Sequence, residues 1–272
     1  MSAGLPFDLS VPQVMGILNV TPDSFSDGGR FNTLDAALAQ AERMVGQGAA
    51  ILDVGGESTR PGAQAVPVDE EMARVLPVIE RLRAEFDIPV SIDTSKPELM
   101  RAAVAAGAGM INDVSALRAP GAVAAAAATG VPVCLMHMQG EPRTMQSAPQ
   151  YDDVVADIIE YLDSRVTACV AGGIPRERLL VDPGFGFGKT LAHNLVLLRD
   201  LRELQRLGLP VLVGISRKSM LGAVTGRAVD QREAASVAAA VMAVERGARI
   251  VRVHDVAATV DALRVWRAVT ES

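Results

Sequence analysis

Short apolar runs recur along the chain, and nearly every one leads into a polar residue that can take part in chemistry. Because the runs are mostly continuous and do not alternate with polar positions, they are typical of parallel strands covered on both faces. They are Val14–Leu18, Ile51–Val54, Val90–Ile92, Met110–Ile111, Val133–Met136, Leu179–Val181, Val211–Ile215 and Ile250–Val253. The polar residues within or after them are Asn19, Asp53, Asp93, Asn112, His137, Asp182, Ser216, Arg252 and His254.

Segments with helical spacing of apolar residues lie between these runs and after the last one. The predicted helices are Leu34–Gln47, Asp69–Glu85, Pro97–Ala106, Ala119–Thr129, Asp152–Gly172, Leu191–Leu207, Gln231–Gly247 and Asp255–Ala268. Ser95 is a candidate N-cap for the third helix, whose first turn holds Pro97. Glycines typical of helix C-termini follow five of the segments, at Gly48, Gly107, Gly130, Gly208 and Gly247.

Eight strand–helix units predict an α/β protein, a single (β/α)8 barrel of eight parallel strands, with residues 1–272 as one domain. An open, doubly wound sheet would also alternate strands and helices. The number of units and the polar residue at almost every strand end favour the closed barrel. In such a barrel these polar residues converge at the C-terminal mouth, where barrel enzymes place their active sites.

Composition excludes several other classes of protein. The hydrophobic fraction of 49% is ample for a large core, and a net charge of −6 argues against non-specific binding to nucleic acid or to a membrane surface. Cys134 and Cys169 are too few for a disulfide framework, and Cys134 is expected to be a buried, inert thiol. No apolar stretch reaches membrane-spanning length and the N-terminus lacks a signal pattern, so we expect a soluble, cytoplasmic protein.

Three loops that follow strands are rich in Gly, Pro, Ser and Asp: Thr21–Gly29, Gly55–Ala63 and Gly184–Lys189. Long polar loops on the catalytic side of a barrel usually bind ligands or cover them, although ordinary turns are the simpler alternative. The third loop, GFGFGK, superficially suggests a phosphate loop. It lacks the GxxxxGK[ST] spacing, so a nucleotide-binding loop is not expected.

Asp93, Asn112 and Asp182 directly follow apolar runs and would form a polar floor at the mouth. Ionised carboxylates only accept hydrogen bonds, whereas an amide both donates and accepts, and this combination suits a neutral, nitrogen-rich heterocycle. The alternative is that each residue only satisfies backbone groups within the barrel. Three such residues at three strand ends favour the ligand-binding interpretation.

A second set of residues suits an anion. Lys218 and Ser219 follow the seventh run, a common anion site in barrels, although solvated surface charge is the alternative there. Arg252 and His254 are two apart in the eighth run and would point the same way, as a phosphate clamp requires. Asn19 and Asp27 offer oxygen ligands for Mg²⁺ held against a substrate phosphate. The three histidines lack zinc-binding spacing.

Eight stretches, in order along almost the whole chain, resemble the bacterial dihydropteroate synthase family. The first four are MGILNVTPDSFSDGGRF (15–31), AILDVGGESTRPGA (50–63), SIDT (91–94) and IND (111–113). The others are LMHMQGEPRTMQ (135–146), DPGFGFGKT (182–190), GISRKSMLG (214–222) and RVHDV (252–256). Any one motif is moderate evidence, whereas eight in sequence are specific.

The resemblance implies a (β/α)8 barrel that joins 6-hydroxymethyl-7,8-dihydropterin diphosphate to 4-aminobenzoate, assisted by Mg²⁺, in a homodimer. It implies that Asn19, Asp93, Lys218 and Arg252 are catalytic, with Asn19 also the metal residue. The implied pterin site is Asp93, Asn112, Met136, Asp182, Phe187, Gly214 and Lys218. The implied diphosphate site is Asn19, Thr59, Arg252, Val253 and His254, and the implied aminobenzoate site is Phe25, Arg60, Pro61 and Ser219.

Three other functions are compatible with parts of the pattern. A pterin-binding methyltransferase domain would share the Asp/Asn floor, but it has no need of the SRKS loop or the RVH segment. A non-catalytic pterin-binding relative would be expected to lack Asn19, Arg60 or Lys218, and all three are present. A generic barrel isomerase or aldolase is what remains if the resemblance is set aside.

Overall fold

The eight predicted strands form one closed parallel barrel in the computed structural model, which describes residues 5, 7–21, 30–58, 65–141 and 144–272. Each strand pairs with the next in sequence, and β1 pairs with β8 to close the ring. The predicted barrel is therefore confirmed, and the open-sheet alternative is wrong. The strands are β1 (Gln13–Asn19), β2 (Ile51–Gly55), β3 (Val90–Asp93), β4 (Met110–Asp113), β5 (Val133–Met136), β6 (Leu179–Asp182), β7 (Val211–Val213) and β8 (Ala248–Val253).

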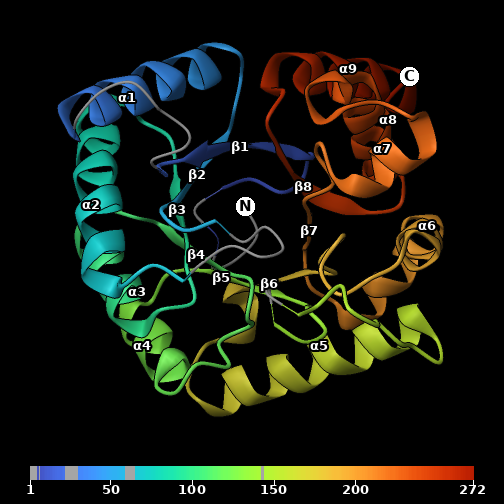
Figure 1. The fold of residues 1–272 in the computed structure, drawn as a ribbon, viewed down its shortest axis with the longest axis horizontal. Coiled ribbons are helices and arrows are strands. Elements are labelled where there is room, and N and C mark those ends of the chain that lie inside the picture. The colour runs from blue at the N-terminus through green and yellow to red at the C-terminus, as the bar shows by residue number, and fades with distance from the viewer. Residues whose placement is uncertain (1–4, 6, 22–29, 59–64, 142–143) are drawn as a thin grey trace.

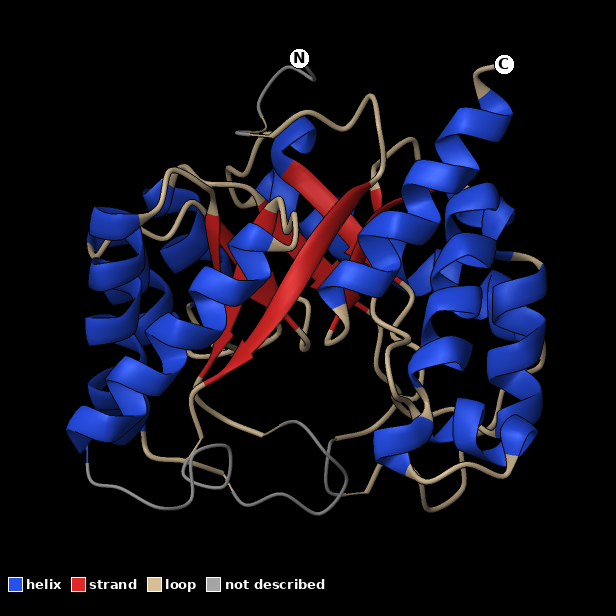
Figure 2. Ribbon diagram, turned by 90° about the horizontal axis from the view of Figure 1, so that it is seen from above, coloured by secondary structure: helices blue, strands red, loops and turns tan. Residues whose placement is uncertain are grey.

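Helices surround the barrel (Figure 1), and the side view shows the strands as a central layer between helices (Figure 2). They are α1 (Arg30–Gly46), α2 (Val68–Glu85), α3 (Pro97–Ala105), α4 (Ala122–Thr129), α5 (Val154–Ala171), α6 (Leu191–Arg199), α7 (Ser219–Thr225), α8 (Glu233–Glu245) and α9 (Val256–Thr270). Short 3₁₀ helices are η2 (Arg176–Arg178), η3 (Leu201–Leu207) and η4 (Val229–Gln231). Within the described residues no helix is long and apolar enough to cross a membrane.

Three local predictions need correction. The helix predicted over Leu191–Leu207 divides at Asp200, because Leu201, Leu204 and Leu207 repeat every three residues and the 3₁₀ helix η3 buries all three on one face. The helix α7 was not predicted. Ser95 is not the N-cap of α3: the cap residue is Lys96, and the Ser95 hydroxyl donates to the carboxylate of Asp113.

The glycines predicted at helix C-termini do adopt left-handed backbone conformations. Gly130 and Gly208 are the C-caps of α4 and η3, with φ of 69° and 63°. Gly48, Gly107 and Gly247 lie just beyond α1, α3 and α8 with φ of 95°, 113° and 100°. A side chain would strain each of these turns, which is why the sequence marks helix ends so clearly.

The core has two parts. The outer part fills the space between strands and helices, and α1 approaches β1 so closely that a Cβ on Gly16 would stand 2.8 Å from Met44 Sδ. The inner part fills one end of the barrel, where Phe7 and Leu9 from the chain start pack against inward side chains of the strands. Those side chains are Met15, Ile51, Met110, Cys134, Leu180, Leu212 and Ile250. Cys134, as predicted, is a buried free thiol.

Candidate active site

Four of the polar residues singled out in the sequence, Asp53, Asn112, Asp182 and Arg252, project into the barrel one layer above this apolar end. Side chains two residues apart on a strand point the same way. The next inward-facing layer is therefore formed by the residues two positions after each inward apolar residue of the strands. It consists of Ile17, Asp53, Asn112, Met136, Asp182, Gly214 and Arg252. The inside of the barrel therefore changes from apolar to charged over one step of the strands.

Strand register places Asn19, Gly55, Asp93 and Asn112 in one continuous row at the mouth. Asn19 on β1 is paired with Gly55 on β2, Gly55 with Asp93 on β3, and Asp93 with Asn112 on β4. A Cβ on Gly55 would stand 3.7 Å from Asn19 Oδ1 and 3.8 Å from Asp93 Oδ2. Because Gly55 has no side chain, the Asn19 amide and the Asp93 carboxylate face the same space.

Arg252 crosses the barrel to join two carboxylates. Its Nε donates to Asp53 Oδ2 at 2.6 Å, and its Nη2 donates to Asp93 Oδ2 at 2.9 Å. The same Asp53 oxygen accepts from Asn112 Nδ2 at 3.1 Å. Asp53 is fully buried, so it depends on these partners to offset the cost of desolvating its charge. Asp53 belongs to none of the binding sets predicted from the sequence, whereas the structure places it at the centre of the network.

Burial governs the protonation of both floor carboxyls. It raises the pKa of Asp93 to about 7, against the opposing effect of Arg252 and with a further contribution from the negative charge of Asp53. Burial also raises the pKa of Asp182, although the Gly184 N–H, 2.7 Å from Asp182 Oδ1, favours the ionised form. The Asp182 carboxyl is also within the electrostatic influence of Lys218 and Arg252. Together with the buried Asp53, the half-buried Asp93 and the buried Asp182 thus lie beside two cations.

Lys218 lies along one side of the floor. Its Nζ is 4.2 Å from the ring centroid of Phe187, a cation–π contact, and donates to the carbonyl of Phe185. Phe187 itself packs with Met136, Met138 and Met145 in a small apolar cluster at the mouth. The structure therefore brings Met136, Phe187 and Lys218 to one wall beside Asp182. Gly214 directly follows β7 and lies beside Arg252 of the neighbouring strand β8. A Cβ added to Gly214 would be 4.0 Å from Arg252 Cβ.

The glycine-rich segment 184–188 is not arranged as a phosphate loop. Lys189 is 3% exposed, and its Nζ lies 2.9 Å from His137 Nδ1, 2.8 Å from the Gly184 carbonyl and 3.0 Å from the Phe187 carbonyl. Burial lowers the pKa of Lys189 and lowers that of His137 to about 2, so His137 is neutral. These groups stabilise the loop from within.

Arg252 and His254 contact different neighbours among the described residues. Arg252 extends toward β2 and β3, whereas His254 Nδ1 lies 3.0 Å from the Ser216 hydroxyl, next to β7. Arg217, with φ of 57°, forms an ion pair with Asp255. The Val253 side chain faces the outer core, so only its backbone can reach a ligand at the mouth. Ser219 is exposed at the start of α7.

Several predicted site residues lie outside the described part of the chain. They are Phe25, Asp27, Thr59, Arg60 and Pro61, which belong to the first two polar loops. Of the implied aminobenzoate site, the structure therefore places Ser219 alone. Asp53 and Lys189 were not predicted as site residues. Both are buried charged residues, and each lies within or directly beside an apolar segment, a feature that could have drawn attention to them in the sequence.

Metal-binding capacity in this region is limited. No group of three or more His, Cys, Asp or Glu side chains in the described residues could hold a metal ion. Asn19 offers a neutral oxygen ligand, and the neighbouring Asp93 oxygen is already bonded to Arg252. This donor set fits Mg²⁺ only when a substrate supplies most of the oxygen ligands, which is usual for magnesium bound with phosphates.

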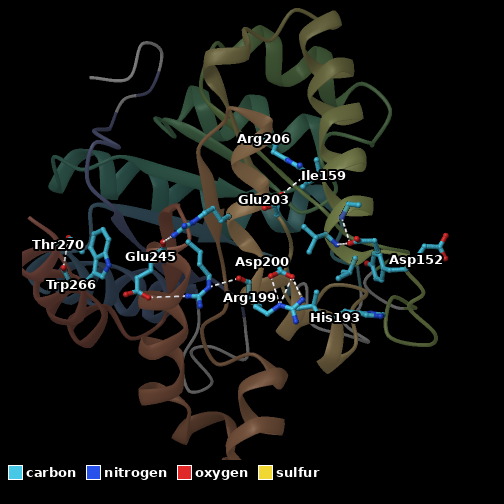
Figure 3. A pocket seen from close by; sticks show the side chains of 18 residues that line it. Asp152, Ile159, His193, Arg199, Asp200, Glu203, Arg206, Glu245, Trp266 and Thr270 are labelled. Atoms are coloured by element: carbon cyan, nitrogen blue, oxygen red, sulfur yellow. Dashed lines mark hydrogen bonds and ion pairs between the residues drawn. The ribbon is translucent and has the colours of Figure 1, made fainter.

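A hollow of about 1130 Å³ lies elsewhere, on the outer wall between α5, α6, η3 and the ends of α8 and α9 (Figure 3). Many of its charged side chains pair with each other: Arg199 with Asp200 at 2.6 Å, and Arg206 with Glu203 at 3.3 Å. The mouth of the barrel, and not this hollow, holds the buried and strongly perturbed carboxyls typical of an active site.

Comparison with known proteins agrees with this geometry. A family model described as pterin binding enzyme matches residues 15–254. The dihydropteroate synthase of Escherichia coli (strain K12) is 55% identical over 265 residues, covering 97% of this chain and 94% of that protein. A structure of Xanthomonas albilineans dihydropteroate synthase with 4-aminobenzoic acid is 59% identical, covers 98% of this chain and 96% of its own, and has a TM-score of 0.93. Another from that species, in complex with 7,8-dihydropteroate, is 53% identical over the same shares, with a TM-score of 0.87.

This chain belongs to the pterin binding enzyme family and, within it, to the dihydropteroate synthases. The family resemblance found in the sequence is confirmed over nearly its full length.

Proposed function

We propose that this chain condenses 6-hydroxymethyl-7,8-dihydropterin diphosphate with 4-aminobenzoate to give 7,8-dihydropteroate and pyrophosphate. The observation that carries the proposal is the buried floor of Asp93, Asn112 and Asp182 beside Lys218, where acceptors and donors suited to a pterin converge. The Xanthomonas albilineans enzyme, similar over almost its whole length, has been solved with 4-aminobenzoic acid and with 7,8-dihydropteroate.

The pterin would lie on this floor. Asp93, Asn112 and Asp182 would bond its nitrogen-rich edge, and Lys218 would donate to an acceptor of the ring. Met136 and Phe187 would contact its flat faces, and the absence of a side chain at Gly214 leaves room near Arg252. Aromatic and thioether groups are well suited to pack against a planar heterocycle.

The diphosphate would extend from the floor toward Asn19, with Arg252, His254 and the Val253 backbone as further contacts. Thr59 joins this set by family resemblance, as Phe25, Arg60 and Pro61, with Ser219, join the aminobenzoate set. Arg252 has five N–H groups, and the two carboxylates of the described structure take one each, so three remain for an anion.

The chemistry requires little general-base catalysis, because an aromatic amine is already nucleophilic at neutral pH. The barrier lies in expelling diphosphate, so donors that stabilise the leaving group carry the catalysis. Dihydropterin can delocalise positive charge from its exocyclic methylene, which favours C–O cleavage before the amine attacks. Asp93 and Asp182 would stabilise that developing cation by their negative potential.

Mg²⁺ would be held by Asn19 together with oxygens of the diphosphate. When bound, it would neutralise the charge of the departing pyrophosphate.

We also propose a homodimer in the cytoplasm. Seven of the eight large apolar side chains exposed among the described residues belong to residues 191–269, on α6, α7, α8 and α9 or near them. These four helices follow one another along one side of the barrel (Figure 1). The seven side chains are Leu191, Leu195, Val224, Val229, Met242, Val265 and Val269. Exposed apolar groups gathered on one side are typical of an interface. The buried free thiols of Cys134 and Cys169 are compatible with a reducing compartment.

The reaction is tested by mixing purified protein, Mg²⁺, the pterin diphosphate and 4-aminobenzoate and measuring dihydropteroate and pyrophosphate together. We expect both products in equal amounts, and neither without aminobenzoate. A parallel reaction with methyltetrahydrofolate and a corrinoid acceptor tests the methyltransferase alternative. Methyl transfer without dihydropteroate would contradict the proposed function.

A further inference from the structure

Asp53 is the point where the pterin side and the diphosphate side of the floor meet. It lies inside β2 at 0% exposure, one layer below the mouth residue Gly55. A single oxygen, Oδ2, accepts both from Asn112 Nδ2 at 3.1 Å and from Arg252 Nε at 2.6 Å. The other oxygen, Oδ1, is buried without a hydrogen-bond partner among the described residues. Asp53 therefore uses a single oxygen to hold both Asn112 and Arg252 in position.

The first consequence concerns the Asn112 amide. A carboxylate accepts hydrogen bonds and cannot donate them, so Asn112 must turn its NH₂ group toward Asp53. Its carbonyl oxygen then faces away from Asp53, and no described residue donates to that oxygen. Asp53 thereby determines that Asn112 presents an acceptor to a ligand on the floor.

The second consequence concerns the Arg252 guanidinium. Its Nε bonds Asp53 on β2 and its Nη2 bonds Asp93 on β3, so two adjacent strands fix the plane of the group. A planar donor held at two points presents its remaining N–H groups in one direction. Without Asp53, Arg252 would keep one anchor and could rotate about it.

We propose that Asp53 is a positioning residue, which acts through Asn112 on pterin recognition and through Arg252 on the diphosphate without itself reacting. This inference rests on the proposed function. Asp113 offers a matched comparison, which separates the effect of positioning Asn112 and Arg252 from the effect of burying a charge. Asp113 is equally buried, but it faces the helices and accepts from the Ser95 hydroxyl and from the N–H groups of Ser115 at 2.7 Å and Leu117 at 2.8 Å.

The test compares Asp53→Asn with Asp113→Asn. Both keep side-chain shape and remove one buried charge. For Asp53→Asn we expect the Kd of the pterin diphosphate, measured by calorimetry without aminobenzoate, to rise about 10- to 100-fold, as the loss of charged hydrogen bonds implies. The KM of aminobenzoate should change less than about twofold. Asp113→Asn should lower the melting temperature and leave both constants near wild type.

Asp53→Ser is a second variant, whose smaller side chain relieves any packing strain, and it should show the same selective loss. Wild-type pterin affinity in either Asp53 variant overturns the proposal, as does an equal loss for both substrates or the same loss in Asp113→Asn. If neither Asp53 variant folds, as judged by circular dichroism, the residue serves folding and the proposal is wrong. Pterin binding without turnover in the wild-type chain would contradict only the proposed reaction, whereas absence of pterin binding would overturn both.

Discussion

Lys218 owes its properties to a half-buried position between a backbone carbonyl, an aromatic ring and a buried carboxyl. Burial lowers the pKa of its ammonium group to about 8, although Asp182 and Asp93 favour the charged form. The group donates to a backbone carbonyl and lies over the Phe187 ring, so it is held in place before a ligand arrives. Its charge therefore changes close to physiological pH.

We expect the kcat/KM of the pterin diphosphate to fall as pH rises above about 8. The reason is that a lowered pKa leaves the ammonium present below this value and lost above it, and kcat/KM reports groups of the free enzyme. A pH series from about 6 to 10 measures this. In Lys218→Arg the side chain stays charged throughout, so the alkaline decline should disappear. A decline that persists unchanged in this variant would assign it to another group.

At this scale the sequence shows which residues face the mouth but not which atoms pair. Asp93, Asn112 and Asp182 could be selected because each directly follows an apolar run. The bonds of Asp53 to Arg252 and Asn112 could not be predicted, because they cross the barrel and depend on the stagger between strands far apart in the chain. Sequence spacing suggested that Arg252 and His254 act together, and their observed partners lie in different directions.

The loop between β6 and α6 shows how an element without regular structure becomes rigid. Every carbonyl from 184 to 188 accepts a side-chain donor. Lys189 bonds the carbonyls of Gly184 and Phe187, Lys218 that of Phe185, Gln146 that of Gly186, and Tyr151 that of Gly188. Such a loop holds the Phe187 ring and the N–H that bonds Asp182 in fixed positions.

Gly184→Ala should therefore be strongly destabilising. Gly184 has φ of 69°, and a Cβ there would stand 1.9 Å from the His137 carbonyl oxygen, which belongs to the backbone and cannot move freely. We expect a loss of about 3 kcal/mol or more in the free energy of unfolding by urea, since strain and overpacking add. Gly173→Ala is the control, because Gly173 has φ of 94° but open space around it. It should lose about 1 kcal/mol, and equal losses would exclude the steric explanation.

Elements were predictable where one local signal dominates. Continuous apolar runs and terminal glycines located all eight strands and most helix ends. The helix α7 was not predicted because its sequence, SMLGAVT, follows a charged loop and is too short to show helical periodicity. The division of α6 from η3 depends on a three-residue leucine repeat that a longer helical pattern conceals.

For the whole molecule, closure of the barrel followed from counting eight units, whereas the proposed dimer interface does not follow from any single element. The exposed apolar side chains on α6 to α9 belong to separate helices, and only the fold brings these helices together along one side of the barrel (Figure 1). On α9, Val265 is 66% exposed and Val269 is 71% exposed, one helical turn apart.

We expect the wild-type chain to sediment as a dimer at micromolar concentration and the double variant Val265→Glu, Val269→Glu to sediment as a monomer. Burying two unpaired carboxylates in an apolar interface costs several kcal/mol, which is enough to dissociate it. Val170→Glu is the control: Val170 is 43% exposed and apolar but lies on α5, outside the set of seven side chains on or near α6 to α9. A wild-type monomer, or a double variant that remains dimeric, would contradict the proposed interface.

The packing of Phe7 and Leu9 against the inner core has a kinetic consequence. Because these side chains and the apolar layer fill one end of the barrel, a ligand can reach the floor only from the opposite end, the mouth. Any molecule resting on Asp93 and Asp182 must enter and leave past whatever occupies the rim. The deeper substrate must therefore arrive first, and a coupled product must withdraw as a whole before the next cycle can begin.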